Sequence, residues 1–161
     1  MPRPPMPPVQ LLRQVLAGAS AAVEAPEFAA ALANDGRGFL DRLPDPKGLP
    51  GWLSEAELDH YVAEFTRTGF TGGINWYRNL DRNWALTEQL DGARIVVPSL
   101  FIGGALDPVL LISPPSVMGG WLTDHRGTVV VEGAGHWVQQ ETPDQVNAAI
   151  VGFVEEIYRA E

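Results

Sequence analysis

The sequence predicts an α/β protein built on a parallel sheet, and three features carry this prediction. Two runs of apolar residues, at about 99–103 and 128–132, are continuous rather than alternating, which is typical of parallel strands buried on both faces. Each run ends in a turn that is rich in glycine, and an amphipathic helix follows the second run. A loop and a short helix near 114–122 separate the runs, as the crossover between parallel strands requires.

Helices dominate the part of the chain before the first run. A first helix is expected over residues 9–19, a second over 26–33, and a third from Ser54 to Gly69. The third is the clearest, because Ser54-Glu-Ala-Glu57 fits a capping box and Gly69 supplies a stop. Its apolar stripe consists of Leu58, Tyr61, Val62 and Phe65, and that of the first helix consists of Leu11, Leu12, Val15 and Leu16.

The last helix follows the second run and begins near Thr142, with a proline in its first turn. Its apolar side chains recur at helical spacing and are Val146, Ala149, Ile150, Phe153, Val154 and Ile157. We expect this face of the helix to be buried against the sheet.

Composition excludes several classes of function. The formal charge is −9 and the basic residues are scattered without a run, which argues against nucleic acid and anionic membranes as partners. No stretch reaches the ~18 uninterrupted apolar residues of a membrane span. The proline-rich start also lacks the apolar centre of a signal peptide. The absence of cysteine rules out disulfides and thiolate chemistry, which suits a cytoplasmic location.

An acid and a histidine are placed at the ends of the two predicted strands. Asp107 follows Gly103-Gly-Ala-Leu106, and His136 follows Gly133-Ala-Gly135. Open parallel sheets bind ligands at the carboxyl ends of their strands, and a carboxylate beside one imidazole nitrogen leaves the other nitrogen as a base. The alternatives are an Asx-type turn at Asp107 and a turn histidine bonded to backbone. Together the two positions favour an acid–base pair.

The other two histidines are weaker candidates. His60 is expected on the solvated side of the third helix, and His125 is expected in a loop. No two of the three histidines have the i, i+4 spacing of a helical metal site, so we expect no metal.

The segment 69–84 is denser in aromatic and amide side chains than a packing helix usually is. Tyr77 lies within it, and two roles remain open: an aromatic anchor, or a phenol that donates a hydrogen bond to a developing oxyanion. Trp76, Met118 and Trp137 are expected to line an apolar substrate pocket, with plain core packing as the alternative.

Three motifs in order resemble a soluble epoxide hydrolase, an enzyme of the α/β-hydrolase fold with a helical lid. They are Gly69-Phe-Thr-Gly-Gly-Ile-Asn-Trp-Tyr-Arg-Asn-Leu-Asp-Arg-Asn-Trp84, Phe101-Ile-Gly-Gly-Ala-Leu-Asp-Pro-Val109 and Gly133-Ala-Gly-His-Trp-Val-Gln-Gln-Glu141. The resemblance implies that Tyr77 is a lid tyrosine, Asp107 the acid partner and His136 the base that activates water. It also implies a small apolar epoxide as the substrate, and no cofactor.

The resemblance extends only to the C-terminal half of such an enzyme. The sequence shows no glycine-flanked nucleophile turn and no Gly-x-Ser-x-Gly elbow. We therefore expect residues 1–90 to form a partial helical lid, and 91–161 to form the C-terminal part of the core, with two parallel strands. Such a sheet has exposed edges. One alternative is thus a non-catalytic fragment that completes its sheet by self-association or with another chain, and another is a different hydrolase with an aspartate nucleophile, such as a dehalogenase.

Overall fold

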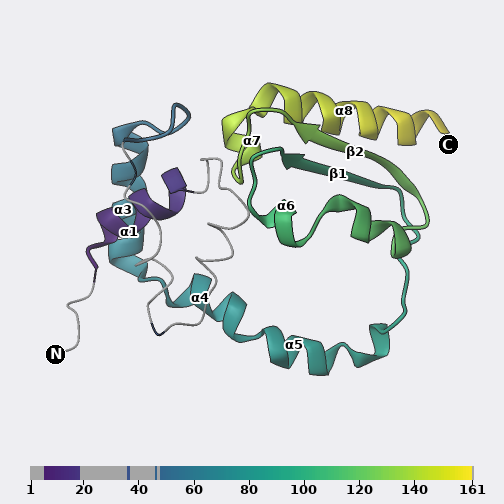
Figure 1. Ribbon diagram of the computed structural model, residues 1–161, viewed down its shortest axis with the longest axis horizontal. Coiled ribbons are helices and arrows are strands. Elements are labelled where there is room, and N and C mark those ends of the chain that lie inside the picture. Colours follow the sequence, from purple (N-terminus) through teal and green to yellow (C-terminus); the bar gives the residue numbers. More distant parts are fainter. Residues whose placement is uncertain (1–5, 19–35, 37–45, 47, 161) are drawn as a thin grey trace.

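The computed structural model describes residues 6–18, 36, 46 and 48–160. Figure 1 shows a helical N-terminal part, a two-stranded sheet and a long C-terminal helix. The elements before the sheet are α1 (Pro8–Gly18), α3 (Glu55–Thr68), α4 (Thr71–Arg78), α5 (Leu80–Leu86) and the 3₁₀ turn η2 (Glu88–Leu90). The sheet and its connections comprise β1 (Ser99–Gly104), α6 (Val109–Ile112), η3 (Pro115–Gly120), β2 (His125–Val131), α7 (Val138–Glu141) and α8 (Pro143–Ala160). The helix expected over 26–33 lies outside the described residues.

The helices α1 and α3 pack through the stripes that the sequence predicts. The predicted capping box is present: the Ser54 hydroxyl accepts from the Glu57 amide at 3.3 Å, and the Glu57 carboxylate accepts from the Ser54 amide at 2.8 Å. Gly69 ends α3 with a φ of 71°, which glycine adopts without strain. The buried cluster of this part consists of Leu12, Leu16, Leu53 and Leu58.

The strands β1 and β2 are parallel, and they pair from Ser99 opposite His125 to Gly104 opposite Val131. The prediction that His125 lies in a loop is wrong, because β2 begins at this residue rather than near 128. The expectation of burial on both faces is also wrong for β2, whose side chains alternate between exposed and covered over most of its length. Backbone pairing needs no apolar side chains, so the polar first half of β2 carries no apolar signal.

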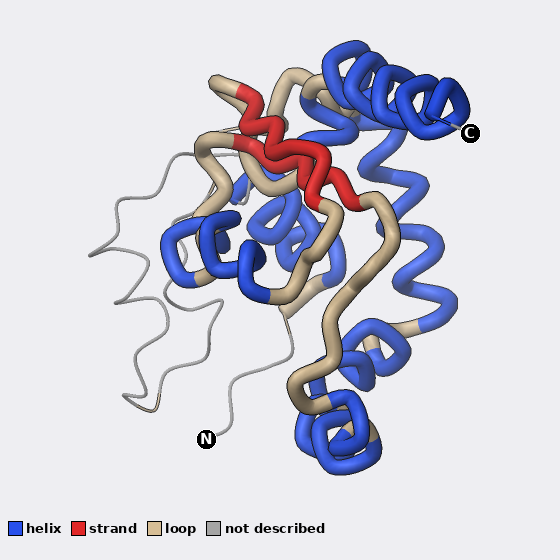
Figure 2. The backbone as a smooth tube through the Cα atoms, turned by 90° about the vertical axis from the view of Figure 1, so that its right-hand side faces the viewer, coloured by secondary structure: helices blue, strands red, loops and turns tan. Residues whose placement is uncertain are grey.

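The helix α8 lies along one face of the two strands (Figure 2). Its predicted apolar face is buried at Val146 and half-buried at Ala149, Phe153 and Ile157. The prediction is wrong for Ile150 and Val154, which are 46% and 39% exposed. Helical periodicity identifies an apolar face but not the width of the surface that covers it, and two strands cover a narrow strip.

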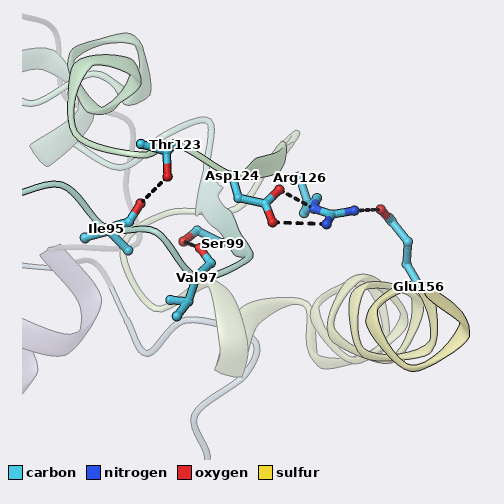
Figure 3. Close-up of polar contacts among 7 residues, drawn as sticks. All are labelled: Ile95, Val97, Ser99, Thr123, Asp124, Arg126 and Glu156. Carbon is cyan, nitrogen blue, oxygen red and sulfur yellow. Dashed lines mark hydrogen bonds and ion pairs between the residues drawn. The ribbon is translucent and has the colours of Figure 1, made fainter. Parts of the chain in front are cut away.

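The segment before β1 continues the parallel arrangement upstream, where an isolated bridge joins Ile95 to Leu122. The hydroxyl of Thr123 donates to the carbonyl of Ile95 at 3.1 Å (Figure 3). At the same end of the sheet, Arg126 connects β2 to α8, because its guanidinium donates to the Glu156 carboxylate at 2.9 Å (Figure 3). The sheet is therefore fixed to α8 by a polar contact as well as by apolar packing.

The helices α4 and α5 form a separate arm of the molecule. Figure 1 shows them along the edge opposite α8, with the sheet between. Every residue from 71 to 90 is exposed, and Trp84 is 83% exposed. Among the described residues, no helix is both long and apolar enough to cross a lipid bilayer.

Candidate active site

Asp107 and His136 meet where β1 and β2 end. Nδ1 of His136 lies 3.0 Å from Oδ2 of Asp107. An ionised carboxylate only accepts hydrogen bonds, so Nδ1 carries the shared proton and Nε2 keeps a free lone pair. The Asp107 side chain is 13% exposed, whereas the His136 side chain is 41% exposed. The pair thus combines a sheltered acid with an imidazole that solvent can reach, as a general base requires.

The Asp107 carboxylate is held at both oxygens. While Oδ2 faces His136, Oδ1 accepts a hydrogen bond from the amide of Val109 at 2.8 Å, at the start of α6. This second bond is the Asx-type turn expected before Pro108. The turn and the acid–base contact are therefore compatible, because each uses a different oxygen of the same side chain.

The two strand-end loops contact each other through their backbones. The amide of Leu106 donates to the carbonyl of Ala134 at 2.8 Å. A Cβ atom on Gly104 would lie 2.2 Å from the carbonyl oxygen of Gly135, which is too close for any side chain. Sequence reasoning missed this role of Gly104. The adjacent pair Gly103-Gly104 at the end of a strand is the signal that indicates such a close approach.

Glu141 is a second residue that sequence reasoning missed. Its carboxylate accepts hydrogen bonds from the amides of Gly135 and Trp137, at 2.8 and 3.0 Å. These amides flank His136, whose ring also contacts the Trp137 ring edge to face, with centroids 5.1 Å apart. The signal in the sequence is a carboxylate a little more than one helical turn after the histidine.

The structure does not bring Tyr77 into contact with the acid–base pair. Tyr77 and Trp76 lie on α4 and are 72% and 74% exposed. Among the described residues, no hydrogen bond joins Tyr77 to Asp107 or His136. Their roles in catalysis and in a substrate pocket stay predictions.

The remaining two residues predicted for the pocket lie elsewhere. Met118 is half-buried in η3, and Trp137 packs against the buried cluster between α1 and α3. A hollow of about 350 Å³ lies between α3 and α7 and is lined by Trp52, Leu53, Ala56, Glu57, His60, Tyr61 and Gln140. It contains none of the residues predicted for the pocket. In the part of the chain that the structure describes, no three His, Asp or Glu side chains cluster so that they could hold a metal ion.

Comparison with known families is decisive for the fold. Residues 3–149 match the model described as the alpha/beta hydrolase family. The chain belongs to the alpha/beta hydrolase family. The Asp107–His136 pair lies where the two parallel strands end, as the sequence predicts.

Similar proteins within this family include epoxide hydrolases. Epoxide hydrolase A of Mycobacterium tuberculosis is 48% identical over 147 residues, which cover 91% of this chain and 46% of that protein. Epoxide hydrolase 1 of Siraitia grosvenorii is 41% identical over 71% of this chain and 38% of that protein. The crystal structure of Epoxide Hydrolase A from Mycobacterium thermoresistibile superposes with a TM-score of 0.83 at 50% identity, over 92% of this chain and 46% of that one.

These findings confirm the predicted resemblance to epoxide hydrolases. They also confirm a part of the α/β-hydrolase fold in which helices flank two parallel strands. The chain spans about half the length of the curated relatives that it matches.

Proposed function

We propose that this chain carries the acid–base part of an epoxide hydrolase site. The observation that supports this most directly is the 3.0 Å contact between Nδ1 of His136 and Oδ2 of Asp107. The contact lies at the carboxyl ends of the strands, where open parallel sheets bind their ligands. Relatives named epoxide hydrolase, at 48% and 41% identity, support the same reaction. The proposed substrate is a small apolar epoxide, and the product is a vicinal diol.

The proposed reaction adds one water molecule in two steps. A nucleophilic carboxylate, which we do not assign to this chain, attacks an epoxide carbon while the C–O bond breaks and the Tyr77 phenol donates to the departing oxygen. Nε2 of His136 then takes a proton from water, and the hydroxide attacks the carbonyl carbon of the alkyl-enzyme ester. The acyl C–O bond of the ester breaks, and the leaving alkoxide takes the proton from Nε2 of His136 to complete the diol. The carboxyl group gives the second proton of the water to the phenolate of Tyr77, which restores the carboxylate and the phenol. Asp107 stabilises the imidazolium that forms in this second step.

In this proposal, residues 1–90 form part of a lid and residues 91–161 form part of the core. Residues 71–90 are all exposed, which supports a lid role, because a lid presents this surface to the substrate and to the rest of the fold. Trp76, Met118 and Trp137 are then the apolar pocket residues.

A chimeric protein tests the proposal. This chain would be joined to the part of Epoxide Hydrolase A from Mycobacterium thermoresistibile that does not align with it, since the aligned part superposes with a TM-score of 0.83. Diol formation from styrene oxide would be measured by chromatography. We expect turnover by the chimera and none by the chain alone.

Substitutions in the chimera distinguish the two steps. His136→Gln should lower turnover by roughly 10³-fold or more, and mass spectrometry should detect the trapped ester. Tyr77→Phe should slow ester formation more than ester hydrolysis. His125→Gln, at the other end of β2, is the matched control and should leave turnover unchanged. A folded chimera that forms no diol, or one that keeps its turnover after His136→Gln, contradicts the proposal.

A second candidate function is assembly without catalysis, and the exposed apolar surface favours it. Trp76, Leu80, Trp84 and Leu86 on α4 and α5 are each more than half exposed. Large exposed apolar surfaces mark sites of protein–protein contact, and a two-stranded sheet leaves open edges. The chain would then complete its sheet by self-association or with another chain. Light scattering after size-exclusion chromatography should give a mass above 17.5 kDa, and a stable monomer at every concentration counts against assembly.

A dehalogenase remains the alternative if the chain is part of an enzyme other than an epoxide hydrolase. A halide leaves as an anion and needs no proton donor, so this reaction gives the Tyr77 phenol no role. We expect the chimera to release no chloride from a chlorinated alkane. Chloride release faster than diol formation would favour the dehalogenase instead.

A further inference from the structure

Glu141 binds two backbone amides of the turn that carries His136. Its Oε2 accepts a hydrogen bond from the Gly135 amide at 2.8 Å, and its Oε1 accepts one from the Trp137 amide at 3.0 Å. Glu141 is the last residue of α7 and its side chain is partly buried. Hydrogen bonds to a carboxylate are roughly twice as strong as those between neutral groups. The two bonds therefore fix a short turn against the helix that follows it.

The turn holds the imidazole on a backbone that belongs to no helix or strand. Residues 132–137 lie between β2 and α7 and form no regular element. The Trp137 amide belongs to the peptide plane after His136, which sets its ψ. The Gly135 amide belongs to the peptide plane between Ala134 and Gly135, one residue before the plane that sets φ of His136. Together the two planes orient the Cα–Cβ bond of His136 toward Asp107. Freedom in either plane moves Nδ1 relative to Oδ2 of Asp107, and a 3.0 Å contact tolerates little movement.

We propose that Glu141 is a positioning residue for His136. By holding the amides of Gly135 and Trp137, its carboxylate keeps Nδ1 of His136 on Asp107, and this maintains the tautomer with a free lone pair on Nε2. The inference rests on the proposed function, because it assigns Glu141 to the base of that same reaction. It adds a residue that never touches the substrate.

A purely structural role is the competing explanation, and it predicts a different result. If Glu141 only fastens the turn, its loss changes the protection of the two amides and the thermal stability, but the tautomer of His136 stays as it is. A positioning role predicts that the tautomer changes as well.

Nuclear magnetic resonance of this chain separates the two explanations without any need for turnover. The tautomer ratio of His136 would be read from its ¹⁵N ring shifts near pH 9, where an ordinary imidazole is neutral. Hydrogen exchange of the Gly135 and Trp137 amides would be followed in the same samples. The test variant is Glu141→Gln, which keeps the shape but sets an NH₂ group against one of the two amides. The matched control is Glu132→Gln, which removes the same charge from an exposed position at the start of the same turn.

In the unsubstituted chain we expect the Nδ1–H form to dominate. In Glu141→Gln we expect the ratio of the Nδ1–H form to the Nε2–H form to fall about tenfold, because one charge-assisted hydrogen bond is lost. One of the flanking amides should exchange roughly ten- to a hundredfold faster. Glu132→Gln should change neither quantity.

Faster exchange with an unchanged tautomer ratio overturns the inference, and so does no change in either. If Glu141→Gln does not fold, Glu141→Asp keeps the charge on a shorter side chain, and the same two criteria apply to it. A chain whose His136 lacks the Nδ1–H form before any substitution contradicts the proposed function itself. The two failures are therefore distinguishable.

Discussion

Nδ1 of His136 and Oδ2 of Asp107 are 3.0 Å apart, although 29 positions separate the two residues in the chain. The parallel pairing of β1 and β2 brings both strand ends to one edge of the sheet. The amide of Val109 holds the other oxygen of Asp107, so the carboxylate cannot rotate without losing a second hydrogen bond. Backbone pairing thus builds the contact, and side-chain hydrogen bonds keep it aligned.

The Asp107→Asn substitution should disable the base while it leaves the fold intact. An amide group that turns its NH₂ toward Nδ1 favours the wrong tautomer of His136. We expect turnover of the chimera to fall by roughly 10³- to 10⁴-fold, with little change in melting temperature. The control is Asp59→Asn, on the exposed surface of α3. Turnover within a few-fold of the parent chimera would show that Asp107 does not orient the base.

The Gly104→Ala substitution should destabilise the protein and separate the two strand-end loops. The added Cβ would lie 2.2 Å from the Gly135 carbonyl oxygen and 2.4 Å from that of Ala134. Overpacking of this kind costs about 1–3 kcal/mol of unfolding free energy. Urea denaturation measures the loss.

Gly127→Ala is the matched control for Gly104→Ala, because it adds the same methyl group to the neighbouring strand. There the new Cβ would meet only a side-chain atom of Leu100, at an ordinary 3.6 Å. We expect a change within about 0.5 kcal/mol. Equal effects of the two substitutions would mean that strand propensity, rather than the close approach of the loops, explains Gly104.

The sequence predicts well those parts of the fold that depend on residues close together in the chain. The capping box at Ser54 and the stripe around Leu58 form within one helix, so neighbours in sequence determine them. The Asp107–His136 pair was also predictable, because both residues follow apolar runs and parallel strands end at one edge.

Other features depend on contacts between distant parts of the chain. Glu141 bonds to backbone amides, so its spacing from His136 indicates its role but no partner side chain does. Ile150 and Val154 match a buried helical face, but their burial depends on how much surface lies opposite α8. Periodicity alone cannot supply that information.

The contact between Arg126 and Glu156 should contribute little to stability. Both side chains are substantially exposed, at 31% and 54%, and solvent-exposed pairs contribute little to the free energy of unfolding. The carboxylates of Asp124 and Glu156 raise the pKa of Arg126, so the guanidinium stays charged at every practical pH. Glu156→Gln should lower the melting temperature slightly at low salt, and less at high salt.

Glu155→Gln is the control, because Glu155 pairs with Arg159 within α8 rather than across to the sheet. A large drop in melting temperature in Glu156→Gln alone would show that this contact fixes α8 to β2 more firmly than its exposure indicates.

The capping box of α3 should make the stability of this helix depend on pH. The hydroxyl of Ser54, and then its amide, donate to Glu57 and lower the pKa of that carboxyl below its ordinary 4.5. A carboxyl with a lowered pKa in the folded state stabilises the fold above its unfolded pKa, and this contribution disappears as the pH falls through the folded pKa. The melting temperature of the parent chain should therefore exceed that of Glu57→Gln near neutral pH. The difference should shrink once the pH is below 4.5.

Circular dichroism at a series of pH values measures both curves, and Glu64→Gln, farther along the same helix, controls for the loss of one charge. Protonation and the substitution to glutamine both remove the charge of Glu57. A constant difference across the series would therefore mean that the ionised carboxylate of Glu57 is not what stabilises the cap.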